Sequence, residues 1–133
     1  ATLAAALMGI GGVKSVEIGA GAACAASVGS RNNDGFCLAQ GRLGFASNDA
    51  GGVLSGITTG QSLVARLSVK PTPSVACPQT AATVGGNLAV VSIEGRHDVN
   101  ITPRVAKVAE AMAALVVVDA LMLAGRLSRE RVR

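Results

Sequence analysis

The sequence predicts an α+β fold, and two patterns of apolar residues carry that prediction. Residues 62–70 alternate apolar and polar side chains, the two-residue period of a strand that buries one face. Residues 102–124 place apolar side chains at helical spacing instead. A hydrophobic share of 50% and a charged share of 15% over 133 residues indicate one folded domain of modest core, not a disordered polymer.

The C-terminal helix has clear predicted ends. Thr102 offers a capping hydroxyl, Pro103 suits the first helical position, and Gly125 suits the position after a helix that ends near Ala124. Three consecutive valines at 116–118 leave little polar face, so we expect the second half of this helix to be covered on most sides. Asp119 within the apolar stretch, and its length of only 17 residues, argue against a membrane span.

Further strands are predicted at Val13–Ile18 and Leu88–Ile93, each bounded by glycine or polar turn residues. Lys70 should lie at the end of the strand in residues 62–70. Residues 41–60 form a glycine-rich connection. Residues 1–10 are typical of the end of a helix already under way, and because Ala1 is not an initiator methionine the chain is expected to be truncated.

Composition narrows the function classes. Seventeen glycines, two phenylalanines and no Trp or Tyr predict a thin aliphatic core that needs partners. The net charge is +4, but four arginines against one glutamate give the tail at 126–133 a charge of +3, so the first 125 residues carry only +1. Without aromatic platforms or a basic stripe, binding to nucleic acid is not expected. The tail is expected to be a solvated helix end.

The cysteines and the single histidine exclude two kinds of site. Cys24, Cys37 and Cys77 are odd in number and widely spaced, and His97 is the only histidine, so neither a disulfide framework nor a metal site is expected. No basic and apolar leader is visible at the start of the chain. The sequence therefore predicts a cytoplasmic protein.

Two short polar segments hold nearly all the chemistry. In Lys70-Pro71-Thr72-Pro73-Ser74, the prolines fix their own φ and extend the residues before them, so Lys70 and Thr72 point in defined directions. The segment could clamp an anion, or it could be a strand-end cation followed by turn formers. The second segment, Gly95-Arg96-His97-Asp98, combines a guanidinium, an imidazole and a carboxylate.

The second segment also has two interpretations. It could be a solvated turn in which Asp98 faces Arg96, or a site in which Arg96 and Asp98 share one face because alternate strand residues do so. A third candidate, Gly51-Gly52 with residues 55–60, has the composition of a phosphate loop without its spacing, and tight turns explain its glycines better.

At these residues the chain resembles chorismate synthase, through five segments in the order of that family's C-terminal part. They are ALMGIGGVKSVEIG (6–19), SNDAGGVLSGITTG (47–60), KPTPS (70–74), GRHD (95–98) and PRVAKVAEAMAALVVVDAL (103–121). The resemblance implies a single C-terminal portion, residues 1–133, of a β-α-β sandwich with antiparallel strands packed on helices. It also implies a homotetramer.

The activity implied by the resemblance is that of an FMN-dependent lyase of aromatic amino-acid biosynthesis. It converts a phosphorylated small molecule, 5-enolpyruvylshikimate 3-phosphate, to chorismate by anti-1,4 elimination of phosphate. The flavin is reduced and is not consumed, and NADPH is the candidate reductant. The family's catalytic histidines and substrate-binding arginines lie in the N-terminal portion, which this chain lacks, so these residues alone are not expected to turn over substrate.

The resemblance also assigns roles to individual residues. Asp98 matches an aspartate proposed to assist proton removal near the flavin N5, which requires a basic carboxylate within hydrogen-bond reach. The positions that match flavin contacts are Lys70, Pro71, Thr72, Pro73, Ser74, Arg96, Ser55, Gly11 and Gly12.

The chain departs from the family pattern at three places. Gly11-Gly12 replaces Asn-Ala or Pro-Ala, Ser55 replaces a glycine, and Val99-Asn100 replaces Pro-Cys. These changes keep a second hypothesis open, in which the chain is a non-catalytic flavin- or anion-binding remnant or an oligomerisation module.

Overall fold

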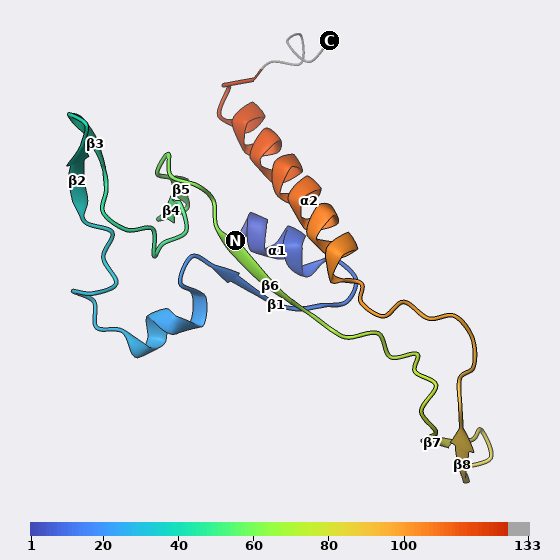
Figure 1. The fold of residues 1–133 in the computed structure, drawn as a ribbon. Coiled ribbons are helices and arrows are strands. Elements are labelled where there is room, and N and C mark those ends of the chain that lie inside the picture. The colour runs from blue at the N-terminus through green and yellow to red at the C-terminus, as the bar shows by residue number, and fades with distance from the viewer. Residues whose placement is uncertain (128–133) are drawn as a thin grey trace.

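Two antiparallel strands form the centre of the computed structural model, which describes residues 1–127 (Figure 1). Strand β1 (Val13–Ile18) has the predicted bounds, and β6 (Ala65–Val69) is a shorter form of the strand predicted at 62–70. Their polar face carries two cross-strand pairs, a hydroxyl hydrogen bond from Ser15 to Ser68 at 2.8 Å and an ion pair of Arg66 with Glu17 at 3.3 Å.

A β-bulge explains how the apolar face of β1 is assembled. The register pairs Val13 with Val69 and then Ser15 with Ser68, so one extra residue, Lys14, lies in β1. This extra residue reverses the alternation. Val13 and Val16 therefore share one face although they are three residues apart.

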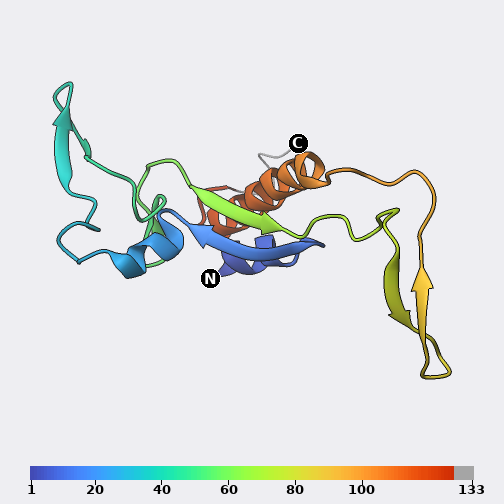
Figure 2. The same cartoon turned by 60° about the horizontal axis from the view of Figure 1, so that its bottom comes forward.

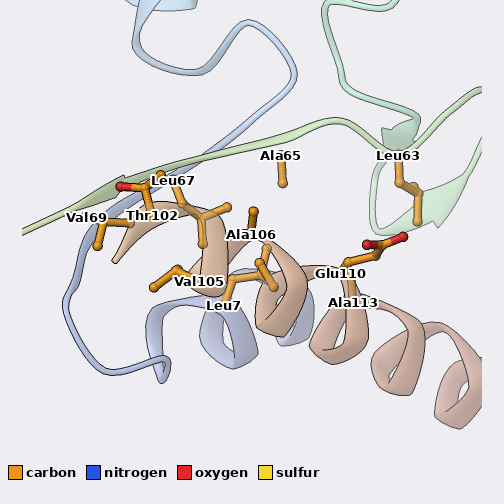
Figure 3. Close-up of a pocket in the computed structure, with 11 residues that line it drawn as sticks. Leu7, Leu63, Ala65, Leu67, Val69, Thr102, Val105, Ala106, Glu110 and Ala113 are labelled. Carbon is orange, nitrogen blue, oxygen red and sulfur yellow. The ribbon is translucent and has the colours of Figure 1, made fainter. Parts of the chain in front are cut away.

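Helix α1 (Thr2–Met8) packs against β1, and helix α2 (Thr102–Leu123) packs against α1. The core is small, because the buried apolar residues are Leu7, Val13 and Val105. Between β6 and the helices runs a groove of about 440 Å³, into which Leu7, Val105 and Leu67 project (Figure 3). Its described lining is aliphatic apart from Thr102 and Glu110, so the groove offers little chemistry.

The ends of α2 lie close to their predicted places, but the N-terminal cap differs. Ile101 occupies the cap position without a side-chain cap, and the Thr102 backbone N–H donates to the Asn100 Oδ1 at 2.9 Å. The prediction that the Thr102 hydroxyl caps the helix is therefore wrong. At the other end Gly125 has a φ of +66°, and the Arg126 N–H donates to the Leu121 carbonyl, which completes a Schellman motif.

The second half of α2 is not covered within residues 1–127. Leu115 and Leu123 are 65% and 83% exposed. The expected cover would therefore have to come from outside the described residues. That cover stays a prediction.

Three β-hairpins complete the fold. Their strands are β2 (Phe36–Ala39) with β3 (Arg42–Phe45), β4 (Val53–Leu54) with β5 (Ile57–Thr58), and β7 (Gln79–Ala82) with β8 (Leu88–Val91). A short 3₁₀ helix, η1 (Gly21–Ala26), follows β1. The β2–β3 and β7–β8 hairpins project at opposite ends of the molecule (Figure 2).

The structure supports the predicted class, α+β with small antiparallel sheets and a long C-terminal helix. Within residues 1–127 no helix has both the length and the apolar character that crossing a membrane requires. Most of the basic tail, residues 128–133, lies outside the described residues.

Candidate functional site

A cavity of about 310 Å³ lies between the two polar segments singled out from the sequence. Thr72 and Ser74 of the first segment line it together with His97 and Asp98 of the second. The rest of the described lining is aliphatic: Val75, Ala76 and Val99. This volume is at the low end for small-molecule sites, and a few polar groups on an aliphatic wall are typical of them.

Strand β6 sets the position of the first segment. The strand ends at Val69, and the Lys70 backbone N–H then donates to the Gly12 carbonyl at 2.7 Å. That bond holds the start of the segment against the turn that precedes β1. The two prolines keep the following backbone extended.

A turn and a helix start set the position of the second segment. Gly95 has a φ of +135°, a conformation that residues with a side chain rarely adopt. A ring nitrogen of His97, Nε2, lies 3.2 Å from the Ile93 carbonyl oxygen. Asn100 then leads into α2, where its Oδ1 accepts a hydrogen bond from the Thr102 N–H.

Thr72 has an unusual hydroxyl. Its Oγ1 is shielded from solvent and has no hydrogen-bond partner within the described residues. Leaving such a group unpaired costs about 1–3 kcal/mol. Thr72 also lines the cavity, so this unpaired hydroxyl lies next to the candidate site.

The ion-pair partner of Asp98 is Arg104, not Arg96. The Arg104 Nη1 donates to the Asp98 Oδ2 at 2.8 Å. Neither sequence interpretation anticipated this pair, because a separation of six residues matches no simple periodicity. The solvated turn in which Asp98 faces Arg96 is therefore wrong, and Arg96 is exposed beside the cavity without lining it.

The other predicted flavin contacts divide into two groups. Lys70, Pro71 and Pro73 belong to the first segment but do not line the cavity. Gly12 lies next to the first segment, because its carbonyl accepts the hydrogen bond from the Lys70 N–H. Gly11, next to Gly12, has open space where a side chain would lie.

Ser55 is placed elsewhere. It lies in the turn between β4 and β5, and the adjacent loop meets the N-terminal end of β6, opposite the end that leads to Lys70 (Figure 1). Within the described chain, Ser55 is therefore not brought to the cavity.

The glycine-rich loop at 47–52 is held by a network of hydrogen bonds that the sequence did not reveal. The Asp34 carboxylate accepts hydrogen bonds from the Ser47 hydroxyl at 2.6 Å and from the N–H groups of Asp49 and Ala50 at 2.7 and 2.9 Å. The Ser47 hydroxyl first, and then the Ala50 and Asp49 N–H groups, lower the pKa of Asp34 below its ordinary value of 3.8.

The glycines of this loop serve packing. Gly51 and Gly52 are buried with φ values of +64° and +79°. A Cβ on Gly52 would lie 2.5 Å from the Ser62 carbonyl oxygen. Close backbone approach and tight turns thus explain these glycines without a bound phosphate.

Comparison with known proteins identifies the family. Residues 1–122 match the chorismate synthase family. The chain belongs to that family. The chorismate synthases of Methanocella arvoryzae and Archaeoglobus fulgidus are 51% and 48% identical to it, over 94% and 97% of this chain.

The fold agrees with that assignment. A chorismate synthase crystal structure superposes on 91% of this chain with a TM-score of 0.68 and 31% sequence identity. The chain spans about a third of the length of the curated relatives, 34% and 36% for the two above, and 29% of the crystallised chain. These relatives are thus about three times as long as this chain.

Proposed function

We propose that this chain contributes part of the active site of a chorismate synthase. The proposed reaction converts 5-enolpyruvylshikimate 3-phosphate to chorismate by anti-1,4 elimination of phosphate. The observation that carries the proposal is the cavity that Thr72 and Ser74 line together with His97 and Asp98. Family membership supports it, because the two segments that meet there are among the five through which the sequence resembles the family.

The residues around the cavity fit the reduced FMN on which the family depends. The unpartnered Thr72 hydroxyl offers a buried hydrogen bond, and the Ser74 hydroxyl offers a second. Lys70 and Arg96 are cations beside the cavity that could neutralise an anionic ligand. When bound, reduced FMN supplies the electron-rich ring beside which the elimination proceeds without net oxidation.

Asp98 is the group proposed to accept a proton. Its Oδ2 is occupied by Arg104, whereas Oδ1 has no hydrogen-bond partner within residues 1–127. Oδ1 is thus the atom available for a proton from a ligand in the cavity. Its carboxylate lies at the cavity edge, half exposed, where a proton can also return to solvent.

The remaining parts of the proposal concern groups outside the described residues. The family's substrate-binding arginines and catalytic histidines would come from the two-thirds of the relatives' length that this chain does not span. A homotetramer would supply cover for the exposed second half of α2. NADPH is the proposed reductant of the flavin. The proposed location of the protein is the cytoplasm.

A chimera tests the proposal directly. These 133 residues would replace the matching third of the Methanocella arvoryzae chorismate synthase, and binding of reduced FMN and release of phosphate would be measured. We expect the chimera to bind reduced FMN and to release phosphate. Asp98→Asn should slow phosphate release with little loss of FMN affinity, whereas Arg96→Ala should weaken FMN binding. A folded chimera with neither activity would overturn the proposal, and equal FMN affinity in the parent and Arg96→Ala would refute the role of Arg96.

A second candidate, a non-catalytic flavin- or anion-binding module, is favoured by one observation. Ser55 replaces a family glycine at a position with a φ of +50°, which a serine adopts only with strain. The same chimera distinguishes the two. Binding of FMN with no phosphate release, in a chimera whose parent enzyme is active, would favour the module.

A further inference from the structure

We infer that Arg104 is a positioning residue for Asp98, and the inference rests on the proposed role of Asp98 as proton acceptor. The Arg104 Nη1 lies 2.8 Å from the Asp98 Oδ2, a distance typical of a charge-assisted hydrogen bond. Among residues 1–127, no partner engages the other carboxylate oxygen. The bond thus orients the carboxylate and leaves Oδ1 for the ligand.

The two residues differ in how firmly their backbones are held. Arg104 lies in the first turn of α2, and its own N–H donates to the Ile101 carbonyl at 3.1 Å. Asp98 lies in an irregular segment between the bend at Gly95 and the start of the helix. The helix therefore provides the fixed point and the Asp98 side chain is the group that is restrained.

The residues that follow Asp98 explain why such a restraint is useful. The chain has Val99-Asn100 after the aspartate, so no proline stiffens the backbone there. An ion pair to the helix compensates by holding the side chain instead. Without it, the Asp98 carboxylate could rotate away from the cavity that it lines.

The expected effect is modest because both side chains are accessible. Arg104 is 75% and Asp98 47% exposed, and an exposed ion pair contributes at most about 1 kcal/mol, or about fivefold. Arg104→Ala in the chimera should therefore lower kcat by about two- to fivefold. The KM for substrate and the affinity for FMN should change less than about twofold, and Arg104→Lys should recover part of the loss.

A double-mutant cycle separates positioning from a merely structural role. In an Asp98→Asn background, Arg104→Ala should cost nothing further in kcat, because the group that it positions is already disabled. Lys107→Ala is the matched control, since Lys107 is exposed one turn later on α2 and pairs with Glu110 at 2.9 Å instead. It should leave kcat unchanged.

Each outcome decides the inference. A full loss from Arg104→Ala in the Asp98→Asn background, no loss in the parent chimera, or an equal loss from Lys107→Ala would overturn it. An inactive parent chimera would instead count against the proposed function. The two failures are therefore distinguishable.

Discussion

The loop at 47–52 and the cavity between the segments at 70–76 and 95–99 satisfy their polar groups in opposite ways. In the loop, one carboxylate, that of Asp34, accepts three hydrogen bonds from the loop itself. In the cavity, the Thr72 hydroxyl has no partner within residues 1–127, and Asp98 is held only by an exposed arginine. The loop is thus built to fold, whereas the cavity leaves polar groups for a ligand.

The largest effect expected is from a methyl group added inside the loop. Gly52→Ala would place a Cβ 2.5 Å from the Ser62 carbonyl oxygen at a φ of +79°. Clash and backbone strain together should lower the free energy of unfolding of the chimera by at least about 2 kcal/mol in a urea titration.

Gly56→Ala is the matched control for this substitution. Gly56 has a φ of +80°, but a Cβ there would meet nothing within 4 Å, so only the strain of about 1 kcal/mol should be lost. Equal losses at the two positions would mean that close packing does not hold the loop.

Removing the charge of Asp34 should give the next largest effect. Asp34→Asn keeps the shape but weakens the acceptor of three hydrogen bonds, so the unfolding temperature of the chimera should fall at pH 7. FMN affinity should not change, because Asp34 does not line the cavity. Asp49→Asn, which leaves the Asp49 N–H in place, is the control and should have little effect.

The unfolding temperatures of the parent chimera and of Asp34→Asn should depend differently on pH. Since the pKa of Asp34 is lowered by folding, its contribution to stability is fully present above the unfolded value of about 3.8 and is lost as the pH falls below it. The difference in unfolding temperature between the parent and Asp34→Asn should therefore shrink between pH 5 and pH 3. A constant difference over that range would contradict the role of the charge.

In the cavity, removing a polar group should have the opposite effect on stability. Thr72→Val deletes the unpartnered hydroxyl at nearly constant shape, so the apo chimera should become more stable by up to about 1 kcal/mol while its FMN affinity falls. Thr72→Ser keeps the hydroxyl and is the control for affinity. A loss of stability in Thr72→Val would show that the hydroxyl has a partner in the protein.

The strongly periodic elements could be predicted from the sequence. The helix from Thr102 to about residue 124 was confirmed because apolar residues recur at helical spacing. The strand at Val13–Ile18 was confirmed although its bulge interrupts the alternation, because glycines bound it on both sides. The hairpin of β2 and β3 was missed. Its turn is Gln40-Gly41, with φ values of +51° and +75°, and glutamine is not a usual first residue of such a turn.

The candidate site was predictable only in its chemistry. Proline spacing and the mixture of charged groups singled out both segments, and the structure brings them together around one cavity. The contacts of Asp34 and Arg104 were not predictable. They depend on where loops meet in space, 13 to 16 residues apart for the bonds of Asp34, and no periodic pattern encodes that meeting.

The smallest effect should come from Ser55, which occupies a strained position outside both regions. It is the first central residue of a two-residue turn between β4 and β5, with a φ of +50°, and Gly56 follows at +80°. A side chain in this conformation costs about 1–2 kcal/mol, and glycine loses about 0.5–1 kcal/mol in chain entropy. Ser55→Gly should therefore raise the free energy of unfolding of the chimera by about 0.5 kcal/mol.

The same substitution tests whether Ser55 acts only in its own turn or also affects the flavin site. If it serves only its own turn, Ser55→Gly changes stability and leaves FMN affinity unaltered, and Ser55→Asn, which tolerates the same conformation, behaves alike. If FMN affinity rises in Ser55→Gly but not in Ser55→Asn, backbone room at this turn contributes to the flavin site. Ser55 does not line the cavity formed by the described residues. A flavin site that includes the Ser55 turn would therefore have to be completed by residues outside residues 1–127.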